Sequence, residues 1–284
     1  MANTIDIRRR IRSVKNTQQI TKAMKMVAAA KLRRAQERMF AARPYSAALR
    51  EVLSSVATRV EELEHPLLHA REERSVLLLV VTADKGLCGA FNSNVIRAAM
   101  NAIHEHNWTS VQLLPIGRKA NDFFRRRTIP IRKAAHVAQA LTLQTAQEIA
   151  KALIEDFITE KVDAVYAVYN EFKSIIAQRV RVERLLPIER AWDEVGTEVE
   201  YLYEPDPATI LSELLPKHIE FQLYRILLES AAAEQGARMT AMEAATKNAS
   251  DMIDHLTLTY NRIRQASITK EIIEIVSGAA AQEG

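Results

Sequence analysis

The chain contains a single cysteine, Cys88, so no internal disulfide framework can hold it together. Only seven of its 284 residues are glycine, which is typical of a chain rich in helix. The longest uninterrupted apolar run, near 76–81, falls far short of the ~20 residues that a membrane span requires. The basic N-terminus lacks the compact apolar core of a signal peptide. We therefore expect a soluble, intracellular protein with a large helical content.

The sequence also lacks the motifs of a nucleotide-binding enzyme. It contains neither G-x-G-x-x-G nor G-x-x-x-x-G-K-[ST]. Gly86 and Gly89 could let backbone amides approach a phosphate at a helix N-terminus, but two glycines in such a turn more often serve tight turning. Cys88 fits a small buried apolar role better than a nucleophile, and His104 with His106 is a weak metal signal. We expect no catalytic residue, no metal and no cofactor.

The last third of the chain is an uninterrupted helical run. From Lys217 to Ser277 there is no proline and one glycine, Gly236, in 61 residues. At ~1.5 Å per residue, such a helix spans roughly 90 Å. A compact domain of this length has a radius of gyration of only about 19 Å, so we expect this helix to project as part of a rod.

The N-terminal residues 4–43 also lack glycine and proline, and they predict the partner helix of that rod. Its apolar or small residues recur in steps of four and three, on one helical face: Ile20, Met24, Ala28, Leu32, Ala35 and Met39. The C-terminal run has a similar stripe, without a strict heptad: Ile219, Leu223, Ile226, Ser230, Ala233, Ala237, Ala241, Ala244, Asn248, Met252, His255, Thr259, Ile263 and Ala266.

Positive charge is concentrated in the N-terminal helix. Residues 1–43 hold twelve basic and two acidic side chains, a net charge of +10, so residues 44–284 must sum to −6 for the chain to reach +4. A solvated face, a nucleic-acid-binding helix and a helix docked on an acidic protein surface would each have this charge. We favour the protein surface, because Met24, Met26 and Val27 lie among the charges and no base-reading motif accompanies them.

The far C-terminus is an apolar tip. Ile272, Ile273, Ile275 and Val276 precede Gly278 and a run of alanines, 279–281. Exposed to water, such a tip is an association site, whereas packing on the chain's own domain is the ordinary alternative. Two other function classes stay open. The first is a nucleic-acid-binding adaptor, which would have little use for this uncharged tip. The second is an enzyme that uses the Gly86–Gly89 turn for a nucleotide, and it predicts saturable nucleotide binding by the isolated chain.

Alternating strands and helices predict an open α/β domain in the middle of the chain. The apolar run 75–82 predicts a buried parallel strand. Pro44 separates the basic helix from a further helix at about 47–60, and Pro205, Pro207 and Pro216 mark the exit from the domain. Further strands are expected at 111–116, 128–132, 162–169, 175–186 and 198–203, and helices at 93–106, 118–126 and 141–159.

Four segments resemble the γ subunit family of F-type ATP synthases. They are ITKAMKMVAAAK at 20–31, ADKGLCGAFN at 83–92, YLYEPDP at 201–207 and NRIRQASITKEIIEIVSGAAA at 261–281. The resemblance extends from near residue 4 to the end, in order and at matching spacing. It implies an antiparallel coiled coil of the two terminal helices (1–60 and 208–284) on a Rossmann-like domain (61–207).

The resemblance further implies a non-catalytic rotor shaft, one copy per complex. Its partners would be the α and β subunits, which form an α3β3 hexamer, the ε subunit and the c ring of the membrane sector. The complex would couple ion-driven rotation to ATP synthesis, and hydrolysis in reverse. No nucleic acid is expected as a partner. Since no transit peptide precedes the match, the resemblance implies a bacterial protein peripheral to the plasma membrane on its cytoplasmic side.

Residue roles follow from the same motifs. Met24 corresponds to a position facing the β-subunit loop that relays torque, although the neighbouring Lys25 is acidic in some relatives. Positions implied in coupling and in polar contact with β are Arg238, Arg264, Gln265 and Thr269. The segment implied to contact the c ring contains Tyr201, Tyr203 and Glu204. With Cys88 alone, thiol regulation of the chloroplast type is not expected.

Overall fold

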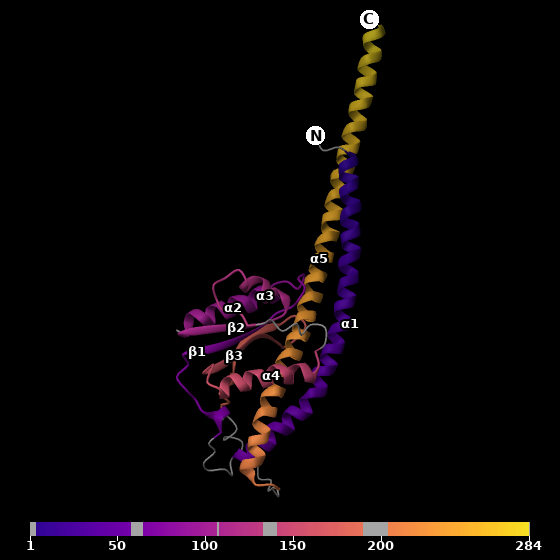
Figure 1. Cartoon of the computed structure of the whole chain (residues 1–284). Coiled ribbons are helices and arrows are strands. Elements are labelled where there is room, and N and C mark those ends of the chain that lie inside the picture. The colour runs from indigo at the N-terminus through magenta and orange to yellow at the C-terminus, as the bar shows by residue number, and fades with distance from the viewer. Residues whose placement is uncertain (1–3, 58–64, 107, 133–140, 190–203, 284) are drawn as a thin grey trace. The chain divides into compact units, whose positions relative to one another are not determined.

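The structure is a computed structural model, and it describes residues 4–57, 65–106, 108–132, 141–189 and 204–283 (Figure 1). Two compact units share the long terminal helices: Met1–Val27 with Met239–Gly284, and Ala28–Arg238. The elements in chain order are α1 (Thr4–Ala57), η1 (Pro66–Leu68), β1 (Ser75–Val81), α2 (Phe91–Glu105), β2 (Ser110–Ile116), α3 (Arg118–Phe124), α4 (Leu143–Ile158), β3 (Ala164–Phe172), β4 (Gln178–Leu186) and α5 (Pro207–Glu283).

The larger unit is built on a four-stranded sheet in the order β2-β1-β3-β4. β1 pairs in parallel with both neighbours, with Ser75 opposite Ser110 and Val76 opposite Ala164. β4 runs antiparallel to β3. The predicted open α/β domain is therefore confirmed, as a mixed sheet.

Both faces of the central strand β1 are covered by helices. Because side chains alternate along a strand, Leu77 and Leu79 point to one face while Leu78 and Val80 point to the other. The second pair packs against α2 and α3. The first pair belongs to the larger core, which is completed by α4 and by parts of α1 and α5. This arrangement explains why β1 is apolar at every position rather than at every second one.

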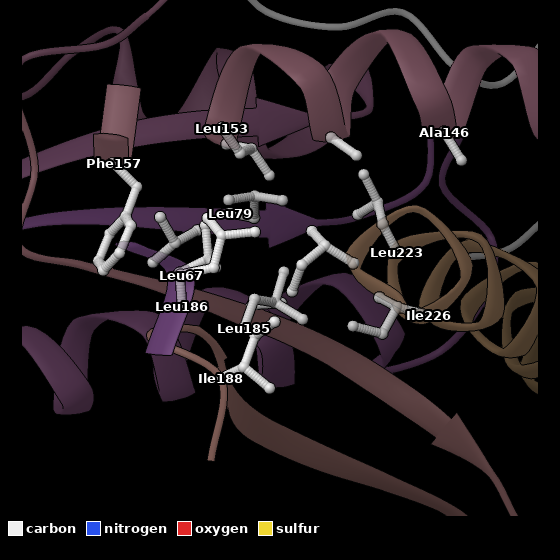
Figure 2. Packing of buried hydrophobic residues seen from close by; sticks show 14 of the residues in the cluster. Leu67, Leu79, Ala146, Leu153, Phe157, Leu185, Leu186, Ile188, Leu223 and Ile226 are labelled. Carbon is white, nitrogen blue, oxygen red and sulfur yellow. The ribbon is translucent and has the colours of Figure 1, made fainter. Parts of the chain in front are cut away.

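The larger core joins α5 to the sheet (Figure 2). Leu223 and Ile226 of α5 point toward Leu79 and Leu185 of the sheet, and Leu153 of α4 covers the same core. Each fully buried side chain of this size contributes roughly 1.5–3 kcal/mol. Helix α5 is thus an integral part of the domain along its first turns.

Neither proline expected to interrupt a helix does so. Pro44 lies inside α1 and Pro216 lies inside α5, so the two-helix interpretation of 4–60 was wrong. A proline in a helix interior costs ~3 kcal/mol. Tertiary contacts next to each proline offset that cost: Tyr45 stacks on Phe221 with ring centroids 3.9 Å apart, and Leu215 is fully buried.

Helix α5 begins at Pro207, ten residues before the expected start of the run. Pro207 occupies the first helical position, where a missing N–H is harmless. Asp206 precedes it, and its carboxylate accepts a hydrogen bond from the Thr209 amide at 3.0 Å. The sequence Asp-Pro is therefore a helix start here, rather than part of an exit loop.

Several strand predictions differ from the structure. β3 begins two residues and ends three residues later than expected, whereas β4 begins three residues later and ends at the expected residue. The strand at 128–132 is reduced to one bridge between Leu113 and Ile131. The strand expected at 198–203 lies outside the described residues. The division into 1–60, 61–207 and 208–284 stays a prediction.

We predict that Gly117→Ala destabilises the chain by about 2 kcal/mol or more. Gly117 follows β2 at a positive φ of 93°, and an added Cβ would lie 2.1 Å from the Thr82 carbonyl oxygen. Urea unfolding of the purified chain measures the change. Gly278→Ala is the matched control, because nothing lies within 4 Å of its Cβ position. Equal unfolding free energies for the two variants would contradict this reading.

Asp156 predicts a pH-dependent contribution to stability. Its buried carboxylate forms an ion pair with Arg132, and the hydrogen bond from that guanidinium lowers the pKa of Asp156. A lowered pKa stabilises the fold above the unfolded-state value of ~3.9, and this contribution is lost as pH falls through the folded-state pKa. We expect Asp156→Asn to lower the unfolding free energy by ~2 kcal/mol at pH 7 and by less below pH ~4.

The control for this prediction is the exposed residue Glu105, because Glu105→Gln removes a surface carboxylate of the same unit. Urea unfolding at pH 7 and pH 3 measures both variants. A cost of Asp156→Asn that is the same at the two pH values would count against the ion pair as its cause.

Candidate functional site

The smaller unit is an antiparallel pair of helix segments. Arg8 of α1 donates to the Tyr260 hydroxyl at 2.6 Å, and Lys25 forms a 2.5 Å ion pair with Glu243 of α5. Between them, the hydroxyls of Thr21 and Thr246 are 2.8 Å apart. Partner numbers rise in α5 as they fall in α1, over 17 residues on each helix. The two helices therefore run antiparallel with a constant register.

The predicted stripe is confirmed in the larger unit, where Ala28, Leu32, Met39, Ile219, Leu223 and Ile226 are buried, but in this helix pair it is wrong at Ile20, Ala244, Asn248, Met252 and His255, which are exposed. Along α1 the less exposed residues recur in alternating steps of four and three: Ile7, Ile11, Val14, Gln18, Thr21 and Lys25. Along α5 they follow the same spacing: Met242, Thr246, Ala249, Ile253, Leu256, Tyr260 and Ile263. This is a heptad repeat, so the expectation of an irregular pattern was wrong.

Two predicted seam residues show the size of the error. Ile20 is 60% exposed and Met252 is 53% exposed, whereas their neighbours Thr21 and Ile253 face the seam. One residue corresponds to ~100° around a helix. Apolar or small side chains also stand next to the buried seam residues in the sequence. Periodicity alone therefore did not decide which of the two adjacent lines of residues is buried.

Met24 lies beside the seam and is half-buried. Met26 and Val27, two and three residues later, present apolar side chains to solvent and are 61% and 56% exposed. Exposed cations lie on the same helix segment: Arg9, Arg10, Arg12, Lys15 and Lys22. This segment of α1 therefore offers a surface that is both basic and apolar, which is typical of a protein-docking face.

Helix α5 continues for 23 residues beyond Tyr260, a rise of about 35 Å. The register places Thr4 opposite Arg264. The candidate residues Arg264, Gln265 and Thr269 are exposed here. The tip beyond them is exposed too, with Ile275 at 72% and Val276 at 62%. The alternative in which these side chains pack on the chain's own domain does not hold.

Arg238 is turned into the larger unit. It forms a 2.6 Å ion pair with Glu234, one turn earlier in α5, and donates to the Gly86 carbonyl at 3.3 Å. Its side chain is only 12% exposed. Arg238 therefore links α5 to the loop that follows β1, a contact within the chain that sequence reasoning did not predict. Its contact with β stays a prediction.

That loop forms a tight turn. Gly89 and Leu87 have positive φ values of 57° and 62°. The Asn92 side chain closes the turn, accepting from the Ala83 amide at 2.9 Å and donating to the Cys88 sulfur at 3.2 Å. Cys88 is 1% exposed, and burial raises the pKa of its thiol. The turning role of Gly89 and the buried role of Cys88 are as expected.

Helix α5 lines the crevice beyond the carboxyl ends of β1 and β2. Ligands of doubly wound α/β domains commonly bind at this end of the sheet. Here α5 crosses it, and Leu227, Ser230 and Glu234 line a remaining cavity of about 40 Å³ together with Thr82 and Gly117. That space suits water rather than a nucleotide.

Within the described ranges, no three His, Cys, Asp or Glu side chains are arranged to hold a metal ion. His106 instead stacks on Trp108, with ring centroids 4.7 Å apart. Among the same residues, no helix is both long enough and apolar enough to cross a membrane. Tyr201 and Tyr203 lie outside the described residues, and Glu204 is exposed two residues before the Asp206 cap of α5.

Comparison with known proteins identifies the family. The model of a family described as ATP synthase matches residues 3–282. The ATP synthase gamma chains of Solibacter usitatus and of Geobacter sp. strain M21 are 55% and 51% identical, over the full length of both chains.

Solved structures agree with these relatives. A chain from the central stalk and c-ring structure of the Tetrahymena thermophila mitochondrial ATP synthase has a TM-score of 0.59 at 29% identity, over 80% of this chain and 99% of that one. A chain of the Euglena gracilis enzyme shares the fold, with a TM-score of 0.69 at 21% identity over 98% and 94% of the two chains. By its sequence along its whole length, this chain belongs to the ATP synthase gamma chain family.

Proposed function

We propose that this chain is the central rotor shaft of an F-type ATP synthase. It couples ion-driven rotation of a c ring to the catalytic cycle of the β subunits. The observation that carries the proposal is the antiparallel helix pair, in which α5 extends about 35 Å past Tyr260 with exposed apolar side chains. Family membership and the central-stalk description of the Tetrahymena thermophila structure support it.

In this role the chain performs no chemistry itself. An off-axis shaft presents a different face to each of three β subunits, so the three catalytic sites are not equivalent at any instant. Rotation then takes each site in turn through substrate binding, synthesis and ATP release. The chain contributes a coupling free energy between distant sites, and such coupling free energies are typically about 1–3 kcal/mol.

The exposed face of α1 is the surface that meets β. Lys22 and the other exposed cations would lie against an acidic loop, while Met26 and Val27 supply apolar contact. Met24, which is half-buried beside the seam, would transmit the push of that loop to the helix pair.

The end of α5 turns inside an apolar sleeve formed by the α3β3 hexamer. Exposed isoleucine and valine side chains fit such a sleeve, where few directional bonds resist rotation. Arg264, Gln265 and Thr269 are exposed at and just beyond the level where α1 begins, so they are available for polar contact with β.

The other partners are the ε subunit and the c ring. Tyr201, Tyr203 and Glu204 form the contact with the ring, and one copy of the chain serves each complex. This arrangement makes the protein peripheral to the bacterial plasma membrane on its cytoplasmic side. The exposure of Glu204 is compatible with that contact.

We predict that Arg264→Ala combined with Gln265→Ala lowers ATP turnover of the reassembled complex at least about fivefold. Both side chains are exposed in the isolated chain, so its thermal stability should not change. The chain is assembled with α and β, and ATPase activity is measured. Arg126→Ala is the matched control, since Arg126 is an exposed arginine of the larger unit. Unchanged turnover, or salt-sensitive binding to nucleic acid without assembly, would argue against the rotor.

We also predict that Ile273→Ser combined with Val276→Ser weakens assembly roughly tenfold while leaving the isolated chain as stable as before. These side chains are 58% and 62% exposed, so they add little to the fold, but burial in a sleeve would make each worth roughly 1 kcal/mol or more. Titration of the chain into α and β measures assembly, with Leu258→Ser as a further exposed control. Equal assembly of the variant and the unmodified chain would reject the sleeve contact.

A further inference from the structure

The glycine in the middle of α5 needs a physical explanation. Gly236 is buried within a helix of 77 residues, where glycine costs ~1 kcal/mol relative to alanine. Its conformation is helical, so no positive φ requires it. What approaches the helix at this residue limits the size of the side chain that fits there.

The hairpin between β3 and β4 is the element that approaches. A Cβ at Gly236 would lie 3.4 Å from the Ile175 carbonyl oxygen, 3.5 Å from the Gln178 amide nitrogen and 3.5 Å from the Phe172 ring. Within the hairpin, the Gln178 side chain donates to the Ile175 carbonyl at 2.9 Å. Ser174 and Ala177 exchange backbone hydrogen bonds of 3.0 and 3.3 Å. The hairpin is thus held closed where it meets the helix.

The loop after β1 holds the same turns of α5 beside the hairpin. Ala233 packs against Ala83, Cys88 and Phe91, and Arg238 donates to the Gly86 carbonyl. Ala233 lies about 60° around the helix axis from Gly236, and Phe172 of the hairpin packs in the same cluster as Ala233. The hairpin and the loop therefore hold neighbouring parts of one side of α5. We call the hairpin 172–178 and the loop 83–91 the collar.

We propose that Gly236 is a positioning residue and that the collar fixes the rotational setting of α5 within the α/β domain. A small residue at position 236 leaves room for the hairpin, since even a Cβ would already touch it, and the Arg238 hydrogen bond ties the same turns of α5 to the loop. These are the last turns of α5 in the larger unit, which ends at Arg238. The effect on coupling rests on the proposed rotor function. If α5 can rotate relative to the α/β domain, less of the rotation reaches the membrane sector, so fewer ions are pumped for each ATP hydrolysed.

The test uses the full chain reassembled with its partners and the membrane sector in vesicles. Gly236→Val adds branched bulk at the hairpin, while Gly236→Ala adds a Cβ at ordinary contact distances and is the conservative variant. Ala208→Val is the matched control on an exposed part of the same helix. We expect Gly236→Val to lower ion pumping per ATP hydrolysed at least about fivefold, and Gly236→Ala and Ala208→Val to keep the ratio of the unmodified complex.

A parallel fall of hydrolysis and pumping, with their ratio unchanged, would reduce Gly236 to a purely structural role and overturn the proposal. If Gly236→Val does not assemble, Gln178→Ala decides, since it removes the hydrogen bond that closes the hairpin without adding bulk. A normal ratio in Gln178→Ala would also overturn it.

Hydrogen exchange in the free chain tests the collar contact by itself, whether or not the rotor function holds. The Ser174 and Ala177 amides should exchange at least about tenfold faster in Gly236→Val than in Gly236→Ala or Ala208→Val. Unchanged exchange rejects the collar. A failure of the unmodified complex to pump during hydrolysis rejects the rotor function instead, and the exchange result still decides the collar.

Discussion

The apolar side chains of α5 between Leu211 and Leu227 pack against one face of the sheet, and the organisation of the larger unit depends on this contact. The sheet needs cover on both faces because β1 is apolar at every position. Helices α2 and α3 cover one face, and α4, α5 and the end of α1 cover the other. The long helices therefore cannot be separated from the domain without exposing its core.

The same contact removes the ligand site that this type of domain ordinarily offers. As α5 crosses the carboxyl ends of β1 and β2, it leaves a cavity of about 40 Å³. Glu234 and Arg238 extend this closure to the loop after β1, and Cys88 is buried beneath it. In this domain the crevice at the carboxyl ends of the strands is lined by the chain's own helix, so the domain holds that helix at the place where related folds often hold a ligand.

The smaller unit has the opposite character, with little apolar burial and much exposed charge. Among the described apolar side chains of this unit, only Ile7, Met242 and Ala249 are buried, and the seam also contains the polar residues Thr21 and Thr246, so it buries little apolar area. Cross-helix polar contacts such as Lys25 with Glu243 fix the register more than they add stability, because exposed ion pairs contribute only ~0–1 kcal/mol. A helix pair of this kind suits a complex in which partner subunits supply most of the contact.

Sequence alone determined the long helices, the charge of α1, the apolar tip and the strands β1 and β2, because each depends on local composition or an uninterrupted pattern. The four family segments determined the candidate residues Met24, Arg264, Gln265 and Thr269. Tertiary structure decided what packing controls: the continuity of helices through Pro44 and Pro216, and the choice of Thr21 over Ile20 for the seam. It also decided the inward turn of Arg238 and the approach of the hairpin to Gly236, since contacts between residues far apart in sequence leave no periodic signal.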